Sequence, residues 1–96
     1  MAVRLISRLS EGRGAVEYDQ VNEEANVAPD PPRGLIFHSA GDVDGVFTII
    51  DVWESTDDLE RFRDERLLPA IEKVMGEEAA WMERPSVAEV HNIVRC

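Results

Sequence analysis

The spacing of hydrophobic residues changes along this chain in an order that constrains its fold more than any other sequence feature. Over 2–9, Leu5 and Leu9 belong to a set that alternates with arginines, which is the period-two pattern of a half-buried strand. Over 15–25, hydrophobic residues recur every three or four positions, as they do on one face of a helix. We therefore predict a strand, then a helix that ends before the proline-rich loop at 28–34.

Two β-branched and aromatic runs follow, at 35–40 and 46–53, on either side of a glycine-bounded segment at 41–45. This arrangement predicts a β-hairpin. Its register has two alternatives. If Ala40 lies opposite Val46, the histidine of the first run and the aspartate of the second lie on different faces of the sheet. If Gly41 lies opposite Val46, both lie on one face.

The second helical segment begins with a recognisable cap. Ser55 stands three residues before Asp58, and acidic residues fill the first turn, where the helix dipole favours negative charge. We expect Pro69 to kink this helix or to begin a new turn, and Gly76 to end the continuation. A last strand is predicted over 87–94.

The resulting order, β-α-β-β-α-β, is typical of an α+β ferredoxin-like fold with an antiparallel sheet and both helices on one face. With 96 residues there is room for one core, so the chain is expected to be a single domain over 1–96.

Both faces of the predicted sheet carry hydrophobic residues, although helices can cover only one. In the run 46–53, one parity holds Val46, Thr48, Ile50 and Val52, and the other holds Phe47, Ile49, Asp51 and Trp53. A second copy of the same sheet is the simplest cover for the other face. We therefore predict a homodimer.

Charge and cysteine content exclude several classes of protein. Ten basic against twenty acidic residues give a formal net charge of −10, which repels nucleic acid and anionic membranes, so neither is an expected partner. No segment is apolar enough to span a bilayer and no signal-peptide pattern is present, which predicts a cytoplasmic protein. The single cysteine, Cys96, rules out an internal disulfide or a cysteine-rich zinc site.

The run Val52-Trp53-Glu54-Ser55, followed by Leu59, Phe62 and Leu68-Pro69, resembles the antibiotic-biosynthesis-monooxygenase-like group of the dimeric α+β barrel superfamily, and so does the last strand. The resemblance implies a homodimer with a cleft between sheet and helices. Members include cofactor-free oxygenases of quinol-like substrates, heme-degrading enzymes, isomerases and proteins without known activity. The heme-degrading pattern wants a first-strand Asn, a Trp in the second helix and a His later on that helix; this chain lacks the Asn and the helix His, so no heme is expected. The two histidines have no companion at ligand spacing, so no metal or other cofactor is expected either.

Two residues are candidates for catalysis. His38 is one of two histidines, and histidine exchanges protons near neutral pH. Asp51 is a carboxylate in the middle of an apolar strand and must find a partner; Arg4 or Arg8 on the first strand would form a structural ion pair, whereas an unpaired carboxylate would act as a base.

Four further residues are candidates for contact with a substrate. Trp53 and Phe62 would supply apolar walls, and Tyr18 on the buried stripe of the first helix would direct its hydroxyl toward the cleft. His91 in the predicted last strand is a second possible proton carrier. Met75, Trp81 and Met82 would form a lid or a satellite core.

We interpret the chain as a small-molecule enzyme that resembles cofactor-independent monooxygenases and acts on an aromatic or apolar substrate. His38 or Asp51 would remove a proton, and the resulting anion would react with oxygen. The alternative is a noncatalytic homodimeric ligand-binding or stress-associated module. An isomerase or cyclase that uses His38 or His91 without oxygen is a third hypothesis.

Overall fold

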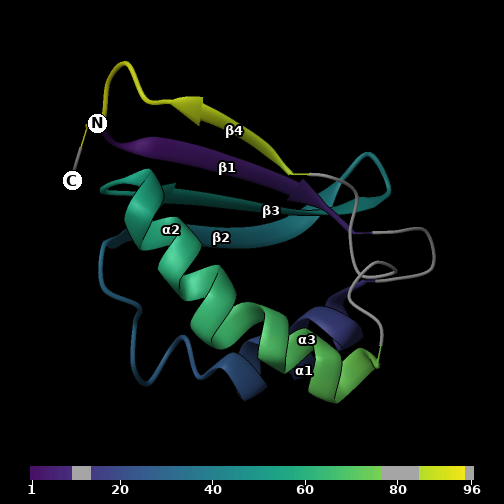
Figure 1. Cartoon of the computed structure of the whole chain (residues 1–96). Helices are drawn as coiled ribbons and strands as arrows, with labels where there is room; N and C mark the ends of the chain where they lie inside the picture. Colours follow the sequence, from purple (N-terminus) through teal and green to yellow (C-terminus); the bar gives the residue numbers. More distant parts are fainter. Residues whose placement is uncertain (10–13, 77–84, 95–96) are drawn as a thin grey trace.

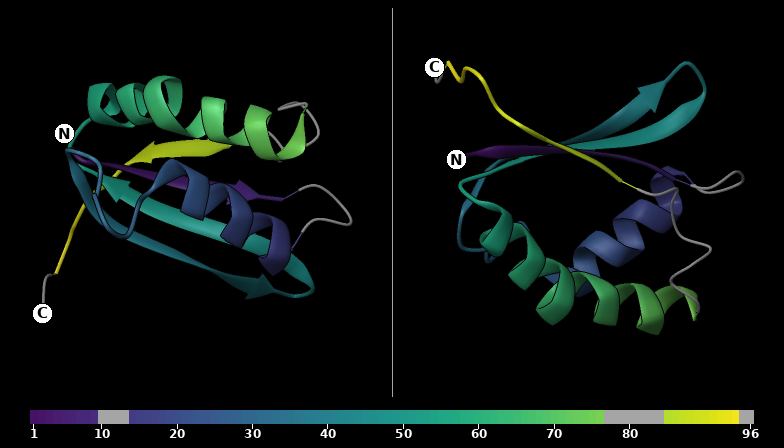
Figure 2. Two further views of the ribbon diagram at one scale, coloured as in Figure 1. Left: turned by 90° about the horizontal axis from the view of Figure 1, so that it is seen from below. Right: turned by 45° about the horizontal axis from the view of Figure 1, so that its top comes forward.

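The computed structural model describes residues 1–9, 14–76 and 85–94. A four-stranded antiparallel sheet has the order β2-β3-β1-β4, and the helices lie together on one of its faces (Figures 1 and 2). The elements are β1 (Val3–Arg8), α1 (Ala15–Ala25), β2 (Leu35–Val43), β3 (Val46–Trp53), α2 (Thr56–Phe62), the π-helix η1 (Arg63–Leu67), α3 (Leu68–Met75) and β4 (Ser86–Glu89). The predicted α+β ferredoxin-like fold is confirmed.

Local signals set the helix ends where the sequence predicts them. The Ser55 hydroxyl accepts a hydrogen bond from the backbone N–H of Asp58, which caps α2. Gly76 ends α3 with a φ of 82°, a conformation that glycine adopts without strain. Pro69 is the second residue of α3 and follows the π-turn η1 directly; it has no N–H to donate, and α3 is the new helical piece that contains it.

The hairpin is tighter than predicted. β2 extends through Val43, and the turn consists of Asp44 and Gly45, both at positive φ, instead of the whole segment 41–45. Val43 lies opposite Val46, so neither predicted register is right, although the observed one puts His38 on the same face as Asp51.

The last strand is shorter than predicted. β4 pairs with β1 only from Ser86 to Glu89, and the N–H of Val90 then donates to the carbonyl of Ala2. Beyond this bond, which lies just outside the start of β1 at Val3, residues 91–94 no longer pair with the sheet.

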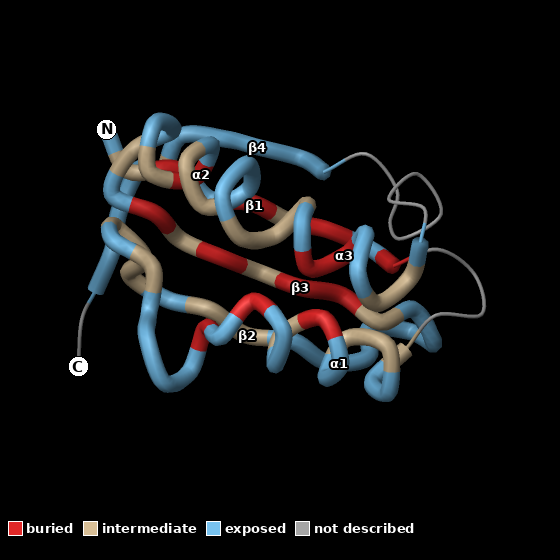
Figure 3. The backbone as a smooth tube through the Cα atoms, turned by 60° about the horizontal axis from the view of Figure 1, so that its bottom comes forward, coloured by how far each residue is buried: buried red, intermediate tan, exposed pale blue. Residues whose placement is uncertain are grey.

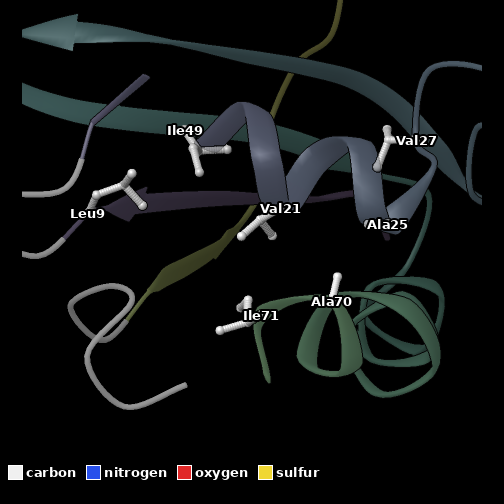
Figure 4. Packing of buried hydrophobic residues seen from close by; sticks show 7 residues of the cluster. All are labelled: Leu9, Val21, Ala25, Val27, Ile49, Ala70 and Ile71. Carbon is white, nitrogen blue, oxygen red and sulfur yellow. The ribbon is translucent and has the colours of Figure 1, made fainter. Parts of the chain in front are cut away.

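The two faces of the sheet are buried to different extents. Along the second half of β3, buried residues alternate with less buried ones (Figure 3). The helix-covered face supplies Leu9 and Ile49 to a core with α1 and α3, drawn in Figure 4. The members of that core are Leu9, Val21, Ala25, Val27, Ile49, Ala70 and Ile71. On the other face, which we call the bare face, Phe37 is 52% exposed and Val46 is 40% exposed.

Candidate functional site

Three polar side chains from three elements form a hydrogen-bonded chain on the helix-covered face. The Oη of Tyr18 on α1 contacts the Nε2 of His38 on β2. The Nδ1 of the same imidazole lies 2.5 Å from the Oδ1 of Asp51 on β3. Asp51 is only 5% exposed, so its carboxylate has little access to water and depends on this imidazole for a partner.

The backbone of the β2–β3 hairpin brings His38 and Asp51 together. The two-residue turn fixes the pairing of His38 with Asp51 directly across the strands. The register then shifts between Leu35 and Phe37, a bulge that allows Leu35 and His38, an odd number of residues apart, to line the same cavity. The alternation of β3 keeps Asp51 and Trp53 on that face.

The electrostatics of Tyr18 set the direction of the hydrogen bonds. Burial, and then the negative charges of Asp51 and Asp19, raise the pKa of Tyr18 from 10.0 to about 12. The phenol therefore keeps its proton, and with a neutral imidazole it donates a hydrogen bond to the Nε2 of His38. The Nδ1 then carries the ring proton and donates to Asp51, so the carboxylate accepts and orients the imidazole.

An apolar cavity lies between the sheet and the helices, and the hydrogen-bonded residues Tyr18, His38 and Asp51 form part of its wall. Its volume is about 50 Å³, enough for a few water molecules at roughly 10–15 Å³ each. Apolar lining residues come from the sheet, α1, the loop at 26–34 and the α2–η1 segment: Leu5, Val21, Ala25, Val27, Pro32, Leu35, Ile49, Phe62 and Leu67. A larger ligand requires that some of these walls move apart.

Trp53 gives the cavity a second polar element. The residue is fully buried and lines the cavity, and its ring packs on Phe62 with centroids 5.3 Å apart. Its indole Nε1 has no hydrogen-bond partner among the described residues. A buried N–H without a partner is costly, so this donor is free to bond an acceptor atom that reaches it.

The structure brings together five of the six residues predicted from the sequence. His38, Asp51, Trp53, Phe62 and Tyr18 all line the cavity. His91 lies outside it, on an exposed bend after the end of β4, because the last strand stops earlier than predicted. Trp81 and Met82 of the suggested lid lie outside the described residues.

The structure corrects the ion pair predicted for Asp51. Asp51 pairs with His38 instead of Arg4 or Arg8, because those arginines project from the bare face, whereas Asp51 faces the helices. The acidic partner of Arg61 is Asp58, three residues away, with Nη1 to Oδ1 at 2.8 Å. This bond lowers the pKa of the Asp58 carboxyl, and so does the hydrogen bond that the Ser55 hydroxyl donates to its Oδ2, although burial opposes both.

Sequence reasoning missed two polar residues of the cavity wall, Ser7 and Asn22. Ser7 is 2% exposed and shares the strand parity of Leu5, a signal that could have placed it inside. Asn22 stands four residues after Tyr18, on the same helix face.

Neither a metal cluster nor a membrane span is found in the parts of the chain that the structure covers. Over 1–9, 14–76 and 85–94, no three His, Cys, Asp or Glu side chains are grouped so that they could hold a metal ion. The helices in these ranges are too short or too polar to cross a bilayer.

Comparison with known proteins gives matches in structure alone. No family model and no curated protein matches the sequence. SnoaB of Streptomyces nogalater, a cofactor-independent oxygenase, is 16% identical, with a TM-score of 0.67 over 97% of this chain and 96% of that one. Rv0793 of Mycobacterium tuberculosis is 12% identical, with a TM-score of 0.71 over 99% and 100%.

A third similar structure is a protein of Chloroflexus aurantiacus described as a "putative antibiotic biosynthesis monooxygenase". It is 14% identical, with a TM-score of 0.67, and 98% of each chain is covered. At these identities the similarity is one of fold, and it extends over nearly the whole chain. The protein therefore has the fold of the antibiotic-biosynthesis-monooxygenase-like group, as the resemblance of its sequence implies.

Proposed function

We propose that the cavity is the active site of a small-molecule oxygenase that removes a proton from an aromatic or apolar substrate. The Tyr18–His38–Asp51 chain in the wall of an otherwise apolar cavity carries this proposal. Such a site holds an apolar substrate by burial and offers it one imidazole as a base. The names of similar structures, SnoaB among them, agree with this chemistry.

The residues would act in sequence on an activated C–H group. When Tyr18 turns its hydroxyl toward the substrate, His38 Nε2 is free to take the proton, and Asp51 stabilises the imidazolium. The carbanion adds dioxygen to give a peroxide anion, which recovers a proton from the imidazolium. Loss of water from the hydroperoxide leaves a carbonyl, so that a CH₂ group and O₂ become C=O and H₂O.

Trp53 would orient the substrate during this reaction. Its unpartnered Nε1–H would donate to a carbonyl or phenolic oxygen, where negative charge accumulates as the proton leaves. Tyr18 would donate to the same region because its raised pKa keeps the phenol protonated.

Anthrone is a suitable test substrate because its CH₂ group, between two rings and opposite a ketone, ionises readily. We expect oxygen uptake and formation of anthraquinone by the purified protein. Replacement His38→Ala should lower kcat/KM by about 10²–10⁴, and Asp51→Asn should lower kcat more than it changes KM. Ser39→Ala, next to His38 but directed to the bare face, is the matched control and should keep full activity.

The second candidate is a noncatalytic ligand-binding module, which one observation favours. In the structure, the Nε2 of His38 is occupied by the Tyr18 hydroxyl, and the cavity is small. This function predicts that anthrone quenches the fluorescence of Trp53 on binding but that oxygen uptake stays at the rate of the protein-free control.

The bare face supports a homodimer as part of this proposal. Its apolar residues come from β1, β2 and β3: Ile6, Phe37, Val43, Val46, Ile50 and Val52. Such a patch is best covered by the same patch of a second copy around a twofold axis. The active site of each copy would then lie on the opposite side of its sheet.

A further inference from the structure

A groove on the outer surface lies directly beyond the cavity. It runs between the loop at 30–33 and the α2–η1 segment, and its volume is about 180 Å³. Pro32 and Phe62 line both the groove and the cavity. These two side chains therefore form a partition, which we call the gate, between the outer surface and the site.

Arg66 on η1 holds both sides of the gate. Its Nη1 donates to the Oδ2 of Asp30 at 3.1 Å, and its Nη2 donates to the backbone carbonyl of the same residue at 2.7 Å. Its guanidinium also lies over the ring of Phe62, 5.6 Å from the centroid. One side chain thus ties the proline-rich loop to the aromatic ring opposite it.

The loop is fixed differently at its two ends. The carbonyl of Gly34 accepts a 2.8 Å bond from the N–H of Glu54, and a Cβ at Gly34 would overlap the side chain of Asp58, so this end is anchored. Toward the other end of the loop, Asp30 is held by Arg66 and by a longer bond of 3.3 Å from its backbone N–H to the carbonyl of Asn26. The side chain of Asp30 is 73% exposed, so water competes for it.

We propose that Arg66 is the latch of this gate and controls the access of substrate to the cavity. While it holds Asp30 and covers Phe62, Pro32 stays against the ring and the cavity remains closed. When it releases Asp30, the loop swings about its anchored end, and the partition opens toward the groove. The inference rests on the proposed function, in that the cavity is taken to receive a substrate.

The π-helical geometry of η1 agrees with this role. Arg63–Leu67 form one wide turn between α2 and α3, and Arg66 and Leu67 are adjacent in it. Leu67 lines the cavity, whereas Arg66 lines the groove. Such turns occur frequently at functional sites, where they redirect side chains that a regular helix would place elsewhere.

Quenching of Trp53 fluorescence by acrylamide tests the latch without any substrate. The chain has two tryptophans, so a Trp81→Phe background leaves Trp53 as the reporter in the cavity wall. In this background, Arg66→Ala should raise the quenching rate constant about two- to fivefold, the change expected when one exposed ion pair is lost. Asp30→Asn keeps the backbone carbonyl and should give a smaller increase.

Arg63→Ala is the matched control, because Arg63 lies on the same π-helix but pairs with its neighbour Asp64. It should leave quenching unchanged, and thermal unfolding should show that all variants are folded. Equal quenching in the Arg66→Ala and Arg63→Ala proteins would overturn the latch.

Hydrogen–deuterium exchange of the Trp53 indole N–H, followed by NMR with Trp81 in place, provides a second readout should the Trp81→Phe background fail to fold. Arg66→Ala should speed this exchange by the same factor, and an unchanged rate would overturn the proposal. Both measurements are independent of turnover. A protein without oxygenase activity whose quenching responds to Arg66→Ala would contradict the proposed function and leave the latch intact.

Discussion

The two faces of the sheet come from the same strands but differ in what they hold. On the helix-covered face, Asp51 is 5% exposed and is bonded to His38. On the bare face, Phe37, the neighbour of that histidine in β2, is 52% exposed. The alternation of side chains along a strand therefore puts proton chemistry on one side and an apolar surface on the other. The comparison indicates that substitutions at adjacent positions should affect different properties.

The largest expected effect comes from breaking the buried pair on the helix-covered face. His38→Leu leaves the carboxylate of Asp51 buried without a partner, which should lower the free energy of unfolding by about 3–5 kcal/mol. The double variant His38→Leu/Asp51→Leu should recover most of this loss. Chemical denaturation at fixed protein concentration measures both.

The matched control for that pair is Ser39→Ala, one residue farther along β2, which should change the free energy of unfolding by no more than about 0.5 kcal/mol. A His38→Leu protein as stable as the double variant would show that the carboxylate does not depend on the imidazole.

A charge on the bare face should weaken the association of two copies instead of lowering the stability of the fold. Phe37→Glu puts a carboxylate within the apolar patch and should raise the dimer dissociation constant at least about thirtyfold. Analytical ultracentrifugation measures this change. Val16→Glu, on an exposed position of α1 that is 67% exposed, makes the same change of charge away from the sheet and should leave the dimer intact. A monomeric wild-type protein at micromolar concentration would contradict the predicted pairing of bare faces.

The smallest effect concerns the stability of the fold at high pH. Tyr18 has a pKa of about 12 in the folded chain, against 10.0 as its ordinary value. The folded state therefore binds this proton more tightly than the unfolded state, and the stability that results is fully present below pH 10 and is lost as the pH rises toward 12. Tyr18→Phe should remove this part of the pH dependence. Urea unfolding of both proteins from pH 10 to 12 measures how their free energies of unfolding change with pH. The two should change alike if the phenol is in contact with solvent.

Much of the fold could be predicted because its signals are local. The Ser55 cap, the Gly76 stop and the alternation in 46–53 each depend on neighbours within a few residues, and all three are present in the structure. The end of the last strand could not be predicted, because it depends on where β1 begins to offer backbone partners, at Val3.

The candidate site was predictable residue by residue but not as an arrangement. His38 and Asp51 are conspicuous as polar residues in apolar strands, yet their pairing depends on a hairpin register that a turn of two residues sets. Strand order alone predicts Arg4 as an equal partner for Asp51. The parity of β1 turns it to the bare face, a relation between strands that no local pattern contains.

The most direct test of the central claim, that the helix-covered face holds a Tyr18–His38–Asp51 chain, is a titration of the phenol. Tyr18 is the single tyrosine of the chain, so the near-ultraviolet absorbance of phenolate reports on it alone. We expect a midpoint at about pH 12 in the folded protein and one near 10.0 in denaturant. We also expect that Asp51→Asn lowers the folded midpoint. A folded midpoint near 10.0, unaffected by Asp51→Asn, would contradict the account.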